Sequence, residues 1–257
     1  MDDPALIIGA TLHIKGDPYT IVEAEYYGPK DPYTHGDRQQ CQYETFYFHR
    51  INGKGYKEGT YKCMDVTVGA PGAPAAYLIR SIRTPDGKLI EGPCLVMNVI
   101  LEAFGYDSVA TFATHYETTN PDLSIRNSAS ELYITDPMAT IPHVARVRVG
   151  LKYKTFSKST PEETLRYCMG RLRYIASNEL SRIKKGPAAT RNESWDPALK
   201  LRGASLGFAG IQAELTGGVA DYSLLQGLYE TLESPVAPVA PVAPVAGPIK
   251  VTVRKRS

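Results

Sequence analysis

The residues best suited to chemistry lie in one stretch near the amino terminus, YTIVEAEYYGPKDPYTH, residues 19–35. An apolar, β-favouring run delivers Glu25 to the expected end of a strand, where two tyrosines and a Gly-Pro turn follow. A carboxylate there can act as a general base, because the strand holds its backbone and the turn lets a substrate reach it. Tyr26, Tyr27 and His35 complete this set of candidate residues. A glutamate after a strand is, however, more often a surface residue than a catalytic one.

Other familiar kinds of site are not indicated. The sequence has no Gly-rich phosphate loop, no GxSxG nucleophile elbow and no HExxH motif. The five histidines lie far apart, and none stands at a metal-ligand spacing from Cys, Asp or Glu. The four cysteines form no CxxC pair, so neither a zinc ribbon nor a disulfide framework is expected. We therefore expect no metal and no cofactor.

The composition is typical of a soluble globular protein. The chain has 257 residues, of which 43% are hydrophobic and 22% are charged, which is enough for a sizeable core. The amino terminus is acidic, and its apolar run is too short for a signal peptide. No later segment reaches the length of a membrane span. These features predict an intracellular, soluble protein that has no membrane partner.

The basic residues are distributed unevenly. The formal net charge is only +2, but the segment from Arg146 to Lys185 contains eleven basic and three acidic residues. Such an asymmetry is expected of a surface that binds a polyanion. A solvated face of strands and a helix explains it equally well.

Short β-favouring segments separated by turns dominate the chain. The expected strands lie at residues 6–14, 19–25, 45–49, 61–68, 75–83, 131–135 and 144–153. The first two and the next two are expected to pair as hairpins, and the strand at 75–83 carries Arg80. A buried helix is predicted at 94–104, and a short helix or a turn is predicted to begin at Pro161. The pattern predicts an α+β fold, a curved and mainly antiparallel β-sheet domain with a few helices.

Three regions are expected along the chain. Residues 1–185 have the pattern of a folded domain. Residues 186–234 are expected to be an extension that is partly ordered at best, with one small helix at 224–232. Residues 235–257 contain a Pro-Val-Ala repeat and a basic tail, and proline favours an extended, disordered spacer there.

Several of these segments resemble the alkyladenine DNA glycosylase family, the 3-methyladenine-type enzymes of base excision repair. The run IVEAEYYGPKDPYTH resembles the IVETEAYxGPxDxAxH motif of that family. Further segments follow in the family's order: TFYFHR, GTYKCMDVTVG, AAYLIRSIRTPDG, EGPCLVMNVILEAFG, ELYITD and VARVRVGLKY. The resemblance covers roughly residues 5–177, and the collinear order is more specific than any single motif. It implies a fold of the alkyladenine DNA glycosylase and formyltransferase C-terminal-like type.

The resemblance also implies an activity. Members of the alkyladenine DNA glycosylase family rotate a damaged purine out of double-stranded DNA. A carboxylate then activates water to attack the sugar C1′, without a metal or cofactor. Glu25 matches the general base, and either Tyr26 or Tyr27 matches the tyrosine that stacks on the base. His35 matches the histidine that contacts the flipped base, and Arg80 matches the arginine that holds the water or a phosphate. A monomer that acts in the nucleus or nucleoid is implied.

The DNA contacts follow partly from the family pattern. The basic strip, of which Arg146, Arg148, Lys152 and Lys154 are the first members, is expected to bind the DNA backbone without regard to sequence. Glu58 stands where the family has the tyrosine that fills the gap left by the flipped nucleotide. Tyr61, or alternatively Tyr56, is then the nearby aromatic side chain that can take its place.

One pocket position also departs from the family. Asp65 stands where the family has asparagine, and we expect it in the substrate pocket, where it alters discrimination among purines.

Two alternatives to a glycosylase remain. The first is a non-catalytic nucleic-acid-binding module on the same scaffold. The second is a β-rich domain whose Tyr, Glu and Arg pattern reflects packing alone. That second alternative predicts an exposed Glu25 and an Arg80 that is ion-paired far from His35.

Overall fold

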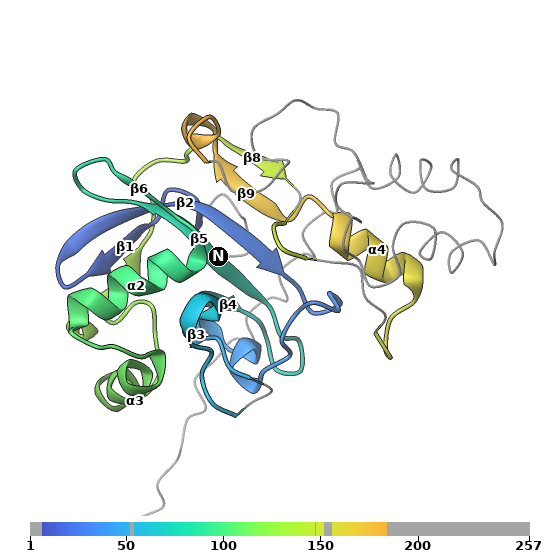
Figure 1. Ribbon diagram of the computed structural model, residues 1–257, viewed down its shortest axis with the longest axis horizontal. Helices are drawn as coiled ribbons and strands as arrows, with labels where there is room; N and C mark the ends of the chain where they lie inside the picture. The colour runs from blue at the N-terminus through green and yellow to red at the C-terminus, as the bar shows by residue number, and fades with distance from the viewer. Residues whose placement is uncertain (1–6, 52–53, 147, 152–155, 184–257) are drawn as a thin grey trace, which may run out of the picture.

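The eleven-residue strand β2 (Asp17–Tyr27) is the centre of a curved antiparallel sheet (Figure 1). The computed structural model describes residues 7–51, 54–146, 148–151 and 156–183. One edge of β2 pairs with β5, and the other edge pairs first with β1 and then with β9. Because both of its edges are hydrogen-bonded, β2 is an interior strand.

The nine described strands form one sheet, in which the main order of neighbouring strands is β3-β4-β5-β2-β1-β7. Strand β6 lies along β5, and β8 pairs with β9. The other strands are β1 (Thr11–Ile14), β3 (Tyr43–Phe48), β4 (Met64–Val68), β5 (Ala76–Arg83), β6 (Leu89–Glu91), β7 (Leu132–Thr135), β8 (His143–Arg146) and β9 (Arg173–Ala176). All the pairings are antiparallel, and the sheet curls into a half-barrel.

Two helices cover one face of the sheet (Figure 1). Within the described residues, the named helices are α2 (Pro93–Phe104), α3 (Val109–Thr119) and α4 (Pro161–Met169), and the short 3-10 turns are η1 (Arg38–Cys41), η2 (Gly59–Tyr61), η3 (Ser128–Ser130) and η4 (Ser177–Glu179). Apolar side chains of α2 and α3 pack against the strands, and Phe112 of α3 contacts Phe48 of β3 with ring centroids 5.4 Å apart. Burial of these side chains supplies the main apolar stabilisation.

The two faces of the sheet differ in chemistry because side chains alternate along each strand. Val22 and Ala24 of β2 lie in the apolar core. The opposite face, called the polar face below, carries Glu23, Glu25 and Tyr27 of β2 with Arg80 of β5, Asp65 of β4 and Tyr47 of β3.

A β-bulge sets the position of Arg80. Consecutive residues Glu23 and Ala24 oppose Ser81 and Ile79, so Arg80 is the extra residue on β5. Arg80 and Ser81 therefore both reach the carboxylate of Glu23.

The predicted fold class is confirmed, as are the helix at 94–104, the hairpin of β1 and β2 and the strand that carries Arg80. Helix α3 was not predicted. The strand expected at 144–153 is wrong in its second half, because β8 ends at Arg146 and the chain bends at residues 149–150. The expectations for residues 186–257, and for Lys152 and Lys154, lie outside the described residues.

Within the described residues, no single helix has the length and apolar composition needed to cross a membrane. The pair α2 and α3, bent by 62°, meets both criteria only when the two helices are taken together.

Candidate functional site

The register of four strands places the candidate residues in one row across the polar face. Glu25 of β2 and Asp65 of β4 both lie opposite Leu78 of β5, and Asp65 also lies opposite Tyr47 of β3. Directly paired residues in an antiparallel sheet project to the same face. The row spans three strand spacings, about 14 Å between backbones. The carboxylate of Glu25 therefore lies at one end of the row and Tyr47 at the other.

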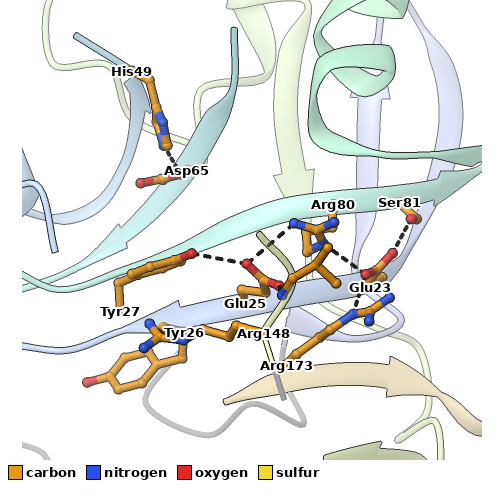
Figure 2. Close-up of polar contacts among 11 residues, drawn as sticks. Glu23, Glu25, Tyr26, Tyr27, His49, Asp65, Arg80, Ser81, Arg148 and Arg173 are labelled. Atoms are coloured by element: carbon orange, nitrogen blue, oxygen red, sulfur yellow. Dashed lines mark hydrogen bonds and ion pairs between the residues drawn. The ribbon is translucent and has the colours of Figure 1, made fainter. Parts of the chain in front are cut away.

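Glu25 is completely buried and both of its oxygens are engaged (Figure 2). Its Oε2 accepts a hydrogen bond from the Tyr27 hydroxyl at 3.0 Å and lies 3.4 Å from Nη1 of Arg80. Its Oε1 accepts one from the backbone N–H of Val149 at 2.6 Å. The expectation of an accessible carboxylate at a strand end is wrong, because Tyr26 and Tyr27 continue the pairing with β5.

A second carboxylate, Glu23, lies next to Glu25 on the same face. Its Oε1 accepts hydrogen bonds from Nε of Arg80 at 2.9 Å and from Nε of Arg173 at 2.6 Å, and its Oε2 accepts one from the Ser81 hydroxyl. All four side chains are buried. Sequence reasoning did not select Glu23, although the spacing of VEAE puts two carboxylates on one face of a strand.

The two adjacent tyrosines have separate environments. Tyr27 projects to the polar face and bonds Glu25, whereas Tyr26 packs against Tyr77 with ring centroids 5.1 Å apart. Of the two, Tyr27 is therefore the tyrosine that shares a face with the candidate base.

Arg148 lies inside the protein and not on a DNA-facing surface, which contradicts its expected role. Its Nη1 donates to Oδ2 of Asp31 at 2.5 Å and to the Tyr26 carbonyl at 3.0 Å, and its Nη2 donates to the Tyr167 carbonyl at 2.7 Å. Its guanidinium stacks 4.4 Å from the centre of the Tyr27 ring. Arg146, the last residue of β8, is half-buried.

The buried charges shift the ionisation of their neighbours. Burial and the adjacent Glu25 carboxylate raise the pKa of Tyr27 well above its ordinary value near 10, so this hydroxyl stays protonated and donates. Burial alone would lower the pKa of Arg80, but Glu25 and Glu23 outweigh it and raise that pKa above the ordinary arginine value. The polar face therefore holds a permanent cation beside the candidate base.

His35 lies at the Tyr47 end of the row. Its Nδ1 is 3.2 Å from the Tyr47 hydroxyl, its Nε2 is 2.9 Å from Nζ of Lys57, and its ring meets that of His49 edge to face at 4.4 Å between centroids. Desolvation of the ring by its neighbours and the nearby His49 lower the pKa of His35 to about 4, although the residue as a whole is exposed. Since Lys57 donates to Nε2, the proton of the neutral ring lies on Nδ1.

Asp65 is buried, and each of its oxygens has a partner. Oδ1 lies 2.6 Å from Nε2 of His49, and Oδ2 accepts a hydrogen bond from the Gln40 side chain at 3.3 Å. Asp65 is therefore buried behind these partners, whereas it was expected to lie in the substrate pocket. His49 and Tyr47 were missed, although alternation in TFYFH places both on one face of the strand.

Glu58, Tyr56 and Tyr61 lie in the loop between β3 and β4 and have different surroundings. Its Oε1 accepts a hydrogen bond from the backbone N–H of Ala110 at 3.0 Å, in the first turn of α3, where a negative charge is favourable. Tyr56 is half-buried and bonds Glu117 at 2.5 Å. Tyr61 is 76% exposed and is the aromatic side chain of this loop that faces solvent.

The alternative of packing alone predicted an exposed Glu25, and this expectation is wrong because Glu25 is completely buried. Its other expectation, an ion-paired Arg80, does hold. Within the described ranges, no group of His, Cys, Asp and Glu side chains is arranged to hold a metal ion.

Comparison with known proteins gives no functional assignment. No protein-family profile matches the chain. A stretch of 116 aligned residues is 38% identical to "Uncharacterized protein L759" of Acanthamoeba polyphaga mimivirus, covering 38% of this chain and 54% of that protein. The chain thus spans about half the length of that relative, whose name states no activity.

Replacing Glu23 with glutamine should destabilise the fold strongly. The change leaves Arg80 and Arg173 with less compensating charge in a buried site, and the expected loss is about 3–5 kcal/mol of unfolding free energy. Chemical denaturation measures it. The control is Glu131→Gln, which removes an exposed ion pair with Lys15 and should cost about 1 kcal/mol or less. Equal effects of the two changes would contradict a structural role for the buried carboxylate.

The imidazole of His35 should titrate with a midpoint of about 4. The ring is then neutral at physiological pH, and its hydrogen bond from Lys57 is lost only as the pH falls through that midpoint. Because the Lys57 ammonium disfavours the imidazolium, Lys57→Met should raise the midpoint. Histidine Cε1–H resonances, followed by NMR against pH, measure both values. A wild-type midpoint near 6.5 would refute this environment.

Proposed function

We propose that the protein is a DNA glycosylase that hydrolyses the N-glycosidic bond of alkylated or deaminated purines in double-stranded DNA. The observation that carries the proposal is the polar face, on which Glu25, Tyr27 and Arg80 meet at one end of a row that leads to Tyr47 and His35. The resemblance of this stretch to the alkyladenine DNA glycosylases supports the same function.

In the proposed reaction, Glu25 removes a proton from a water molecule that attacks C1′ of the flipped nucleotide. The bond from C1′ to the purine nitrogen breaks, and the purine leaves with the bonding electrons. Arg80 holds the carboxylate from one side and Tyr27 from the other. Attack requires one oxygen of Glu25 to bind water, so the N–H of Val149 has to give up its place on Oε1 when the nucleotide enters.

A second candidate function is a non-catalytic nucleic-acid-binding module. The observation that favours it is the complete burial of Glu25, whose two oxygens are both occupied by protein donors. In that case the carboxylate serves only to fix Tyr27, Arg80 and Val149. Base release separates the two candidates, because binding alone leaves the glycosidic bond intact.

Tyr61 is the residue proposed to fill the gap that a flipped nucleotide leaves in the duplex. This ring is exposed, whereas Glu58 is engaged with the amino terminus of α3 and Tyr56 bonds Glu117. An aromatic ring can stack on the neighbouring bases, which a carboxylate cannot do.

Glu25→Gln should abolish base release and leave DNA affinity nearly unchanged. The loss of the general base is expected to slow release by about 100- to 10,000-fold. The assay uses duplex oligonucleotides that carry hypoxanthine or ethenoadenine, followed by alkaline cleavage at abasic sites. The matched control Glu102→Gln removes an exposed carboxylate from α2 and should retain full activity. Comparable release by Glu25→Gln excludes Glu25 as the base, and no release by the wild type favours the binding module.

Tyr61→Ala should weaken binding to a lesion-containing duplex by about 5- to 150-fold, the equivalent of about 1–3 kcal/mol of lost stacking. Tyr61→Phe keeps the ring and should bind like the wild type. Fluorescence anisotropy gives the affinities, and a melting curve of each variant checks that the exposed side chain does not affect folding. If Tyr61→Ala and Tyr61→Phe bind equally well, the ring does not enter the duplex.

A further inference from the structure

A hollow opens at the β3 end of the polar face, away from Glu25. Its volume is about 510 Å³, within the range of about 300–1,000 Å³ that holds small ligands. One wall comes from the segment that leads into η1, and the other comes from the loop after β3. The lining residues are His35, Gly36, Asp37, Arg38, Tyr47, Arg50, Ile51 and Lys57.

The hollow has an excess of positive charge. Three of its side chains are cationic, those of Arg38, Arg50 and Lys57, against the single carboxylate of Asp37. That carboxylate accepts the backbone N–H of Gln39 at 2.9 Å and caps η1, and its one negative charge offsets only one of the three positive charges. The charge of the hollow therefore has to be balanced by solvent ions or by a ligand.

The three cations are engaged to different degrees. Arg50 is ion-paired with Glu117 at 3.1 Å and bonds the Tyr56 hydroxyl at the same distance. Lys57 contacts the neutral imidazole of His35, which satisfies one donor and leaves the charge uncompensated. Arg38 is exposed. In the part of the chain that the structure describes, neither Lys57 nor Arg38 is ion-paired with a carboxylate.

The donors that converge here suit an anion with several acceptor oxygens. A guanidinium binds two phosphate oxygens side by side, and an ammonium binds phosphate as a compact point charge. The basic strip that begins at Arg146 cannot supply all the phosphate contacts expected of it. Two of its members are buried in ion pairs, Arg148 with Asp31 and Arg173 with Glu23. The hollow therefore offers a second source of such contacts.

We infer that the hollow between His35 and Lys57 is a phosphate-binding site, with Arg38 and Lys57 as its main contacts. The ligand is a phosphate ester, either in a nucleic-acid backbone or in a free nucleotide. On binding, the ammonium of Lys57 exchanges its contact with His35 for a phosphate oxygen. The site does not require Glu25 to act as a base.

The first test measures the affinity of the full chain for an undamaged fluorescent DNA duplex between about 50 and 200 mM salt. Arg38→Gln and Lys57→Gln should each weaken binding and reduce the slope of log affinity against log salt by about 1. The charge-matched control is Lys15→Gln, which lies in the turn between β1 and β2, at the far side of the sheet, and should leave the slope unchanged.

A second measurement is local to the hollow. The His35 Cε1–H resonance should shift when inorganic phosphate, a deoxynucleoside monophosphate or the duplex is added, and Lys57→Gln should reduce the shift. A response to the small phosphates identifies a free-ester site, and a response to the duplex alone identifies a backbone contact; either supports the inference. It is overturned if no probe moves the resonance, or if the duplex alone moves it while both variants keep the wild-type slope. If the wild-type protein releases no base but still gives these responses to phosphate, the proposed glycosylase activity is refuted and the phosphate site remains supported.

Discussion

Two carboxylates of β2, those of Glu23 and Glu25, are buried on the polar face of the sheet. An uncompensated charge in the interior costs several kcal/mol, so Glu23 and Glu25 require cations that the fold brings from elsewhere. Arg80 arrives from the bulge on β5 and contacts both, and Arg173 arrives from β9. The last strand, β9, therefore supplies one of the two arginines that compensate the charge of Glu23.

The polar face has two ends with different properties. At the β2 end, protein donors fill every oxygen of the buried carboxylates, and the guanidinium of Arg148 covers the ring of Tyr27. At the β3 end, His35 and Lys57 border an open hollow with uncompensated charge. Chemistry at the first end therefore depends on displacing a protein contact, whereas binding at the second needs no rearrangement of the sheet.

The sequence patterns predicted the elements whose signals are local. Helix α2 is a continuous apolar run closed by Gly105, and the hairpin of β1 and β2 has a strong turn. Helix α3 was not predicted because its sequence is rich in Thr. In addition, the carboxylate of Glu58, which accepts a hydrogen bond from the backbone N–H of Ala110 in its first turn, lies 52 residues away in the sequence. The buried position of Arg148 was not predicted either, because its ion-pair partner Asp31 lies 117 residues away in the sequence. Alternation could identify which side chains share a face, but it could not identify which strands cover that face.

The contact between Glu23 and Arg173 spans 150 residues of sequence. During synthesis at about 5–20 residues per second, Glu23 leaves the ribosome roughly 8–30 seconds before its second arginine. Strands β1 to β7 can pair in that interval, but the central strand keeps an unsatisfied charge until β9 docks. Completion of the sheet is thus a late, non-local step, and contacts of such long range slow folding. A nascent chain that ends before β9 would carry Glu23 with only one of its two arginine partners, and incompletely paired chains of this kind are recognised by chaperones or proteases.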